Sequence, residues 1–297
     1  MIKPTLIILC GIPGSGKTAY AKSYIEHNCN TVHLSSDAIR KELYGDESIQ
    51  GNPVDVFSLM KKRAIDALNN GCNVIYDATN ITRKDRASII DVCPKFAKIE
   101  CHVIWAPIEV CIEIDSKRER TVGKEVIDRM LKRFQAPYYD EGIDEIKVIL
   151  PHHFNTHDYI NSLCSSMEIP HDNPHHTLDI LDHCVEADRY IIEKTGEYSS
   201  DIGFAAFYHD VGKPYVKAFV DNKDNPCEHA HYYQHHCVSA WLSYGACCLA
   251  TYSDAVKIAW MISTHMDPFM NTKYYNNLPP FLKREIDLLH EADLAAH

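Results

Sequence analysis

The sequence predicts a three-layer α/β domain built on a parallel sheet, followed by an all-α domain. Three observations predict this fold class. Up to residue 150, short apolar runs alternate with helical patterns, which is typical of a parallel sheet covered by helices on both faces. From Pro170 onward the patterns are almost all helical. The composition changes at the same place, because residues 151–297 carry the whole formal net charge of −11 and 15 of the 18 histidines.

The elements of the first domain follow the alternation in order. Strands are expected where apolar residues run together, and helices where apolar residues recur at spacings of three and four. The expected strands are 6–10, 31–35, 73–77, 99–106 and 146–150, and the expected helices are 17–28, 56–69, 83–92, 108–118 and 125–134. We therefore expect a first domain over 1–150, a connector over 151–170 and a second domain over 171–297.

The second domain is expected to consist of helices over 176–193, 202–209, 234–248, 253–261 and 282–293. No apolar run approaches the roughly 18 residues that a membrane helix needs, which excludes a membrane-spanning protein. The 12 cysteines include no Cys-x-x-Cys pair and lie in apolar segments, which indicates free thiols and a cytoplasmic location. The strongly acidic second half is a poor non-specific binder of nucleic acid.

A phosphate loop follows the first predicted strand directly and precedes the first predicted helix. The segment Gly11-Ile-Pro-Gly-Ser-Gly-Lys-Thr18 fits the pattern G-x-x-x-x-G-K-[ST]. Lys17 is expected to hold the β- and γ-phosphates, and Thr18 to ligate Mg²⁺. The backbone N–H groups of the loop close around phosphate oxygens, and the residues expected to form it are Gly11, Pro13, Gly14, Ser15 and Gly16. The sequence thus predicts a site for ATP, or another nucleoside triphosphate, with Mg²⁺.

Two further motifs follow later strands of the same predicted sheet. In Ser35-Ser-Asp-Ala-Ile-Arg40, Asp37 can accept the proton of an attacking hydroxyl, and Arg40, one turn later, can grip a substrate phosphate. The alternative is a helix N-cap followed by a surface arginine. Asp77 ends the strand 73–77, where a carboxylate would lie near Mg²⁺.

Basic residues are also frequent over 117–133, on a predicted helix pair. They either supply cations to the nucleotide or form a solvated helix face.

Together these residues resemble the 5′-OH polynucleotide kinases of phage and bacterial RNA repair, over about residues 5–145. The resemblance implies that Asp37 is the general base and that Arg40 clamps the phosphate beside the accepting 5′-hydroxyl. It also implies a lid near 108–135, in which Arg118 stabilises the transferring phosphate. An arginine often found one turn earlier is Ile114 here, and Arg120 is the candidate substitute in binding the nucleotide. P-loop kinases of small hydroxyl substrates share the loop and often the acidic base, and are the alternative.

A series of histidines and aspartates runs through the second half. It consists of His183, His209-Asp210, His235, His265 and Asp293, with gaps of 26, 25, 30 and 28 residues, each about one helix and one turn. Such an array can converge inside a helical bundle as imidazole and carboxylate ligands for one or two divalent ions. An isolated histidine, by contrast, is usually a core or surface residue. The repeated spacing therefore predicts a metal site that can activate water and neutralise phosphoryl charge.

This series, with His-Asp-Val-Gly-Lys213, resembles the HD phosphohydrolase superfamily over roughly residues 170–297, and most closely the HD module fused to bacterial CCA-adding enzymes. Those modules act on 2′,3′-cyclic and 2′-phosphates of RNA ends. The resemblance implies that Lys213 contacts the scissile phosphate. We expect the metal to be a divalent transition ion, Mn²⁺, Ni²⁺ or Co²⁺. His236 is the alternative to His235, and His175 and His176 are candidates for lining the pocket. The resemblance implies these ligands: His183, His209, Asp210 and Asp293 for one metal, and His235 and His265 for a dinuclear site.

The two resemblances together predict a nucleic-acid end-healing enzyme. One site would phosphorylate 5′-OH ends with ATP, and the other would remove a 2′,3′-cyclic, 2′- or 3′-phosphate from the opposite end. A separate RNA ligase would then receive ligatable RNA ends, with DNA ends as the alternative, and no membrane takes part. Two other functions stay open. One is a nucleoside or small-molecule kinase fused to an HD nucleotidase, and the other is a regulatory sensor that binds ATP and metal.

Overall fold

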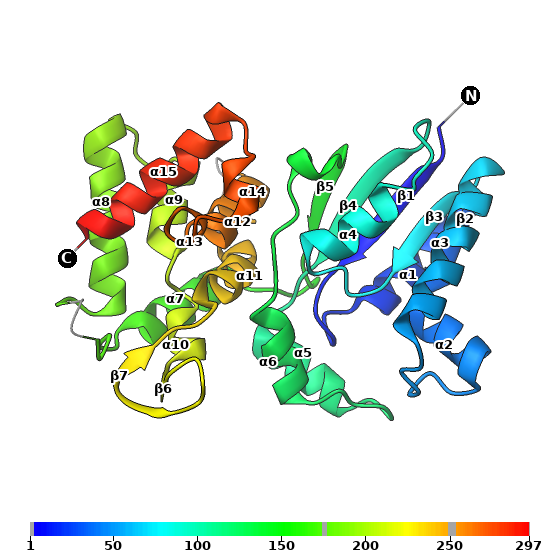
Figure 1. Ribbon diagram of the computed structural model, residues 1–297, viewed down its shortest axis with the longest axis horizontal. Coiled ribbons are helices and arrows are strands. Elements are labelled where there is room, and N and C mark those ends of the chain that lie inside the picture. Colours follow the sequence, from blue (N-terminus) through cyan, green and yellow to red (C-terminus); the bar gives the residue numbers. More distant parts are fainter. Residues whose placement is uncertain (1–2, 174–176, 249–253, 297) are drawn as a thin grey trace. The chain divides into compact units, whose positions relative to one another are not determined.

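The computed structural model describes residues 3–173, 177–248 and 254–296. Its contacts divide the chain into two compact units (Figure 1). The first unit comprises Met1–Met130 and Pro137–Pro151, and the second comprises Leu131–Ala136 and His152–His297. The main change of unit thus lies close to residue 150, where the composition of the sequence changes.

A five-stranded sheet forms the centre of the first unit. Its strands are β1 (Thr5–Cys10), β2 (Thr31–Ser35), β3 (Asn73–Asp77), β4 (Lys98–Ile104) and β5 (Glu145–Ile149). They lie in the order β2-β3-β1-β4-β5, and every neighbouring pair is parallel. The predicted parallel sheet is confirmed. Because β1 lies in the middle, the loop that follows it emerges at the centre of the carboxyl edge, where open α/β sheets bind ligands.

Helices cover both faces of this sheet, because successive residues of β1 point to opposite sides. Leu6 and Ile8 are buried in a cluster with residues of α3 (Pro53–Asn69) and α4 (Arg83–Ile90). Ile7 and Leu9 are buried on the other face with α1 (Lys17–His27). The remaining elements of this unit are α2 (Ser36–Tyr44), α5 (Ile108–Ser116), α6 (Lys124–Leu131) and the 3-10 turn η1 (Tyr139–Glu141).

A fully buried arginine supports the turn after β3. Arg86 of α4 makes two hydrogen bonds to the carboxylate of Glu141, at 2.7 and 2.6 Å. A third, at 3.1 Å, joins Arg86 Nη1 to the carbonyl of Asn80, a residue with a positive φ of 45°. The amide of Asn80 in turn donates to the carbonyl of Leu9 at 2.7 Å. This network fixes the turn after Asp77 against the end of β1, which carries the phosphate loop.

Replacing this arginine is expected to destabilise the first unit strongly. Arg86→Met keeps most of the side-chain volume but leaves Glu141 without its buried partner, which costs about 3–5 kcal/mol in comparable pairs. The measurement is urea unfolding followed by circular dichroism. Glu42→Gln is the matched control, because Arg63 and Glu42 form a bidentate pair of similar length on the surface. An equal loss of stability in both variants would show that burial of the ion pair is unimportant.

The second unit is mainly helical in the part that the structure describes. Its helices α8, α9 and α15 pack against one another, and α11 packs against α12. None of the described helices is long and apolar enough to span a membrane. The helices are α7 (Thr156–Met167), α8 (Ile180–Thr195), α9 (Asp201–Tyr208), α10 (Lys213–Val216), α11 (His235–Cys247), α12 (Ala255–Thr264), α13 (Asp267–Met270), α14 (Lys273–Asn276) and α15 (Pro280–Ala295).

The prediction that the second half is all-α is wrong in one respect. An antiparallel hairpin joins β6 (Ala218–Val220) and β7 (Pro226–His231). Its turn is built by Asp221, whose carboxylate accepts hydrogen bonds from the backbone N–H groups of Lys223 and Asn225, at 2.7 and 2.9 Å. Because β7 is short and largely polar, the hairpin lacks the apolar alternation by which a strand is recognised.

Two helices that were not expected, and one helix boundary, also differ from the predictions. The connector holds α7, which is capped by Asn155 and buries Leu163 and Met167. Helix α2 begins directly after β2, where the Ser35 hydroxyl caps it, so Asp37 lies in its first turn. Helix α8 begins at Ile180 because Asp179 is its N-cap. Residues 176 and 253, where two helices were expected to begin, lie outside the described residues.

Candidate functional site

The phosphate loop follows β1 and is shaped by close approaches that only glycine permits. Gly14 and Gly16 have φ angles of 80° and 97°, in the left-handed region. A Cβ on Gly14 would lie 2.1 Å from the carbonyl oxygen of Cys111. Pro13 and Ser15 are buried in the same turn, which ends at the first residue of α1. The loop is therefore held in one conformation with its backbone close to the start of a helix, as a phosphate cradle requires.

Lys17 and Thr18 extend this cradle toward the end of β3. The ammonium of Lys17 donates to the carbonyl of Ile12 at 2.8 Å, and the hydroxyl of Thr18 donates to Asp77 at 3.1 Å. Burial lowers the pKa of Lys17, although the carboxylate of Asp77 acts in the opposite direction. His33 Nε2, which the sequence did not single out, lies 3.0 Å from the same oxygen of Asp77. A hydroxyl beside a carboxylate at this place is suited to holding Mg²⁺ with phosphates.

The predicted acceptor residues lie together at the start of α2. Arg40 Nη1 donates to Asp37 Oδ1 at 2.7 Å. Arg120 Nη1 lies 3.6 Å from the same oxygen and also donates to the carbonyl of Glu47 at 2.6 Å. The structure therefore places Arg120 beside Asp37. The sequence expectation placed Arg120 among the nucleotide-binding residues.

Asp115 organises the loop that carries the predicted lid arginines. It is buried at the end of α5, and its carboxylate accepts hydrogen bonds from the backbone N–H groups of Val122 and Gly123, at 3.0 and 2.9 Å. Arg118 is exposed in this loop, and its positive charge contributes to lowering the pKa of Lys17. Asp115 gave no sequence signal, because an aspartate followed by basic residues is typical of any solvated helix end.

The histidine and aspartate series of the second unit converges into two groups of close ligand atoms. The first group is His183, His209, Asp210 and Asp293, and the second is Asp210, His235 and His265. Within each group the ligand atoms lie within 4.8 Å of one another. Asp210 belongs to both groups, with Oδ2 3.3 Å from His209 Nε2 and Oδ1 3.1 Å from His235 Nε2. The arrangement is that of two neighbouring groups of candidate cation ligands that share one carboxylate.

Backbone carbonyls orient all four imidazole rings. Each ring directs Nδ1 to a carbonyl oxygen, and the other nitrogen, Nε2, faces the aspartates. His209 and His265 each follow the last residue of a helix and bond the carbonyl three residues earlier. Hydrogen bonds of this kind select the tautomer and fix the ring, as in metal-binding histidines. The Nδ1 partners are Ala296 for His183 (2.6 Å), Ala206 for His209 (2.7 Å), Tyr232 for His235 (2.9 Å) and Ile262 for His265 (2.7 Å).

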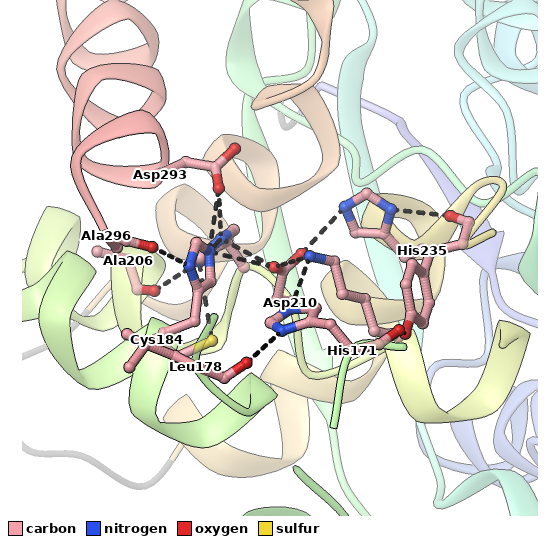
Figure 2. A network of polar contacts seen from close by, with 12 residues as sticks. His171, Leu178, Cys184, Ala206, Asp210, His235, Asp293 and Ala296 are labelled. Atoms are coloured by element: carbon pink, nitrogen blue, oxygen red, sulfur yellow. Dashed lines mark hydrogen bonds and ion pairs between the residues drawn. The ribbon is translucent and has the colours of Figure 1, made fainter. Parts of the chain in front are cut away.

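Figure 2 shows Asp210 at the centre of this network, with Asp293 reaching it from α15. Burial favours neutral carboxyls, but the pKa of Asp210 is lowered well below its usual value, chiefly by the charges of His209 and Lys213. Burial likewise works against a charged His209, yet Asp210 raises the pKa of His209 well above the usual range. The buried carboxylates therefore attract positive charge, which a proton on His209 or a divalent cation can supply. Imidazole nitrogens with carboxylate oxygens fit a transition metal or Zn²⁺.

Lys213 lies beside the shared aspartate and not at the surface. Its ammonium is 2.5 Å from Asp210 Oδ2 and 3.2 Å from His171 Nε2, and it lies over the ring of Tyr232, 5.4 Å from the centroid. Gly212, just before it, lets this loop approach α11, since a Cβ there would lie 2.6 Å from the carbonyl oxygen of His235. Sequence reasoning missed His171, because its contact with Lys213 joins residues 42 positions apart.

The structure also distinguishes the neighbouring histidines. His235, the first residue of α11, supplies Nε2 to the second group of ligand atoms. His236 is buried next to it, with its ring packed against those of His235 and His265. His175 and His176 lie outside the described residues.

Comparisons with known proteins match the first part of the chain. Residues 6–137 match a family model described as an AAA domain, AAA_33. The L-seryl-tRNA(Sec) kinase of Methanococcus maripaludis is 27% identical over 143 residues, which are 44% of this chain and 53% of that protein. This chain therefore spans about half the length of that curated relative. The first part of the chain has a parallel α/β fold with a phosphate loop and is similar to P-loop kinases.

Two solved structures are also similar in part. A chain of a Pnkp1/Rnl/Hen1 RNA repair complex is 26% identical, with 45% of this chain and 44% of that chain covered and a TM-score of 0.41. A fungal RNA kinase is 12% identical, with 50% of this chain and 76% of that chain covered and a TM-score of 0.37.

Proposed function

We propose that this chain is an end-healing enzyme with two active sites for nucleic acid, most simply RNA. The first unit phosphorylates 5′-OH ends with ATP, and the second removes 2′,3′-cyclic, 2′- or 3′-phosphates in the manner of an HD phosphohydrolase. The observation that carries this proposal is that one chain holds two separate groups of side chains suited to phosphate chemistry. A phosphate loop with a neighbouring Asp-Arg pair lies in one unit, and two ligand groups that share Asp210 lie in the other.

In the kinase step, the 5′-hydroxyl oxygen attacks the γ-phosphorus of ATP and the bond to the bridging oxygen of ADP breaks. Asp37 accepts the hydroxyl proton, and Arg40 holds the phosphate next to the acceptor. Lys17 and the loop amides bind the β- and γ-phosphates, while Thr18 and Asp77 hold Mg²⁺. Arg118, in the loop that Asp115 fixes, reaches the transferring group when ATP is bound. The kinase relative, whose name includes a tRNA-borne acceptor, supports a P-loop kinase that acts on RNA-linked hydroxyls.

In the phosphoesterase step, divalent ions would be held by His183, His209, Asp210 and Asp293, with His235 and His265 as ligands of a second ion. Such ions, when bound, activate water and neutralise phosphoryl charge. Lys213 is positioned by Asp210 and His171 to bind an oxygen of the scissile phosphate. The burial of these residues keeps bulk water away from their charges, which strengthens each interaction.

The acceptor of the kinase is tested with a panel of hydroxyl substrates. A 5′-OH RNA oligonucleotide, the matching DNA and a free nucleoside are incubated with Mg²⁺ and γ-labelled ATP, and gluconate serves as the small hydroxyl substrate. We expect kcat/KM for the oligonucleotides to exceed that for the nucleoside by about 100-fold, because a phosphate bound by arginine is worth about 1.5–3 kcal/mol per charged hydrogen bond. Turnover of the nucleoside or gluconate, with none of either oligonucleotide, would establish a small-molecule kinase instead.

A further inference from the structure

A tight turn between β7 and α11 connects the hairpin to the second group of ligand atoms. The backbone N–H of His235 donates to the carbonyl of Tyr232 at 3.1 Å, which closes a four-residue turn. Gln234, the third residue of this turn, has a positive φ of 64°. The Tyr232 carbonyl also accepts a hydrogen bond from His235 Nδ1, at 2.9 Å. Tyr233 therefore lies at the tip of a turn whose last residue is a candidate metal ligand.

The two tyrosines of this turn have different surroundings. The ammonium of Lys213 lies over the ring of Tyr232, whose hydroxyl donates to the carbonyl of His171. The ring of Tyr233 instead stacks on that of His231, the last residue of β7, with centroids 5.2 Å apart and planes inclined by 4°. The Tyr233 hydroxyl lies 3.3 Å from His231 Nδ1. Tyr233 is nevertheless 44% exposed, which leaves the ring face opposite His231 open to a ligand.

The hairpin that carries this stacked pair is fixed to the rest of the second unit. The backbone N–H of Ala230 donates to the carbonyl of Asp172 at 2.9 Å, and the side-chain amide of Asn173 donates to the Ala230 carbonyl at 3.2 Å. Lys217, directly before β6, pairs with the Asp172 carboxylate at 2.7 Å. Figure 1 shows the hairpin beside α10, whose first residue is Lys213. An aromatic ring on such a support is ordered before a ligand binds, which lowers the entropic cost of binding.

We propose that the open face of Tyr233 stacks on the base of the nucleotide whose phosphate binds at Lys213 and the ligand groups. Every nucleobase has a π face, and aromatic side chains bind bases through it whatever the sequence. In a nucleoside 2′- or 3′-phosphate only the ribose separates base from phosphate, and in the chain only Gln234 separates Tyr233 from His235. The inference rests on the proposed phosphoesterase function and deepens it, since it makes nucleotides the preferred class of phosphate ester.

The test compares substrates that differ only in the base. Adenosine 2′,3′-cyclic phosphate and methyl riboside 2′,3′-cyclic phosphate share the sugar and the phosphate, and the corresponding 2′- and 3′-phosphates form two further pairs. Wild-type protein, Tyr233→Ala, Tyr233→Phe and Tyr198→Ala are assayed with Mn²⁺, Ni²⁺ or Co²⁺ and without ATP, so that the kinase does not act. Tyr198→Ala is the matched control, because Tyr198 is 80% exposed in the loop between α8 and α9.

A binding measurement complements the kinetics and does not depend on turnover. A 2-aminopurine nucleoside 3′-phosphate is titrated with each protein without added metal, and excess ADP occupies the phosphate loop. The fluorescence of 2-aminopurine is quenched when the base stacks on an aromatic ring. The difference in quenching between the wild type and Tyr233→Ala therefore reports stacking on Tyr233.

We expect the wild type and Tyr198→Ala to prefer the adenosine substrates by about tenfold in kcat/KM, within the range measured for one base stacked on an aromatic ring. Tyr233→Ala should remove this preference by raising KM for the adenosine substrates, with kcat within about twofold, because stacking away from the reacting phosphate stabilises ground state and transition state equally. The methyl riboside substrates should be unaffected, and quenching should fall. Tyr233→Phe should retain preference and quenching, because it keeps the ring.

The inference is overturned if Tyr233→Ala keeps the wild-type preference, or if the wild type has none. An equal loss on both kinds of substrate would also contradict it, because Tyr233 would then act only through the position of His235. The proposed function fails separately, if the wild type hydrolyses neither kind of substrate nor a 2′,3′-cyclic oligonucleotide. In that case equal quenching in the wild type and in Tyr233→Ala would overturn the inference as well.

Discussion

Asp210→Ala is expected to abolish the phosphoesterase activity of the second unit while the kinase activity stays at the wild-type level. Asp210 contributes an oxygen to each of the two ligand groups, so its removal opens both at once. Loss of residues that only orient metal ligands lowers affinity or activity by 10- to 100-fold, and we expect at least about 100-fold for this shared ligand. The measurements are release of phosphate from a 2′- or 3′-phosphorylated oligonucleotide and metal content by mass spectrometry.

Two further variants give this prediction its controls. Glu186→Ala removes a carboxylate from the surface of α8, where Glu186 pairs with Arg189, and should leave both activities and metal content unchanged. Asp210→Asn keeps the shape of the side chain but removes its charge, which separates loss of the ligand from a disturbed fold. Full metal content and phosphoesterase activity in both Asp210 variants would show that the cluster is not the catalytic metal centre.

Lys17→Ala is expected to have the opposite effect to Asp210→Ala: it should lower the kinase activity and leave the phosphoesterase activity unchanged. The Lys17 ammonium lies at the end of the phosphate loop and is desolvated, so its charge acts on bound phosphates with little screening from water. Removing one such stabilising group typically lowers kcat by about 10²–10³-fold. We expect kinase activity to fall by that factor while phosphoesterase activity is retained.

The matched control for this variant is Lys22→Ala, an exposed lysine on the same helix. Both variants are assayed for transfer of labelled phosphate to a 5′-OH oligonucleotide at saturating ATP. Kinase activity in Lys17→Ala equal to that of Lys22→Ala would mean that the phosphate loop is not the site of phosphoryl transfer.

The sequence was most informative where structure depends on local pattern. The phosphate loop, β1 and α1 could be placed to within one residue, because glycines, an apolar run and a Lys-Thr pair define them locally. The spacing of the histidines and aspartates could predict that they converge inside a helical bundle. It could not predict that each ring binds a backbone carbonyl, such as Ala296 for His183, since that contact joins residues 113 positions apart.

Features that depend on distant contacts were not predictable. Arg86 looks like an ordinary basic residue of an amphipathic helix, and only the folded chain brings it to Glu141. His171 can be recognised as part of the site only from its contact with the ammonium of Lys213, 42 residues later in the sequence. Arg120 was the candidate substitute for a lid arginine, and its position beside Asp37, in the loop that Asp115 fixes, could not be read from the sequence. The hairpin of β6 and β7 was not predicted, because hydrogen bonds to a polar side chain define its turn and its strands lack apolar alternation.

The most direct test of the two-site account uses one RNA oligonucleotide with a 5′-OH and a 2′,3′-cyclic phosphate. It is incubated with ATP, Mg²⁺ and Mn²⁺, Ni²⁺ or Co²⁺, and its ends are identified by mass spectrometry. The wild type is expected to add a 5′-phosphate and to remove the terminal phosphate, Lys17→Ala to perform only the removal, and Asp210→Ala only the addition. RNA that emerges unchanged at both ends from the wild-type reaction would contradict the account.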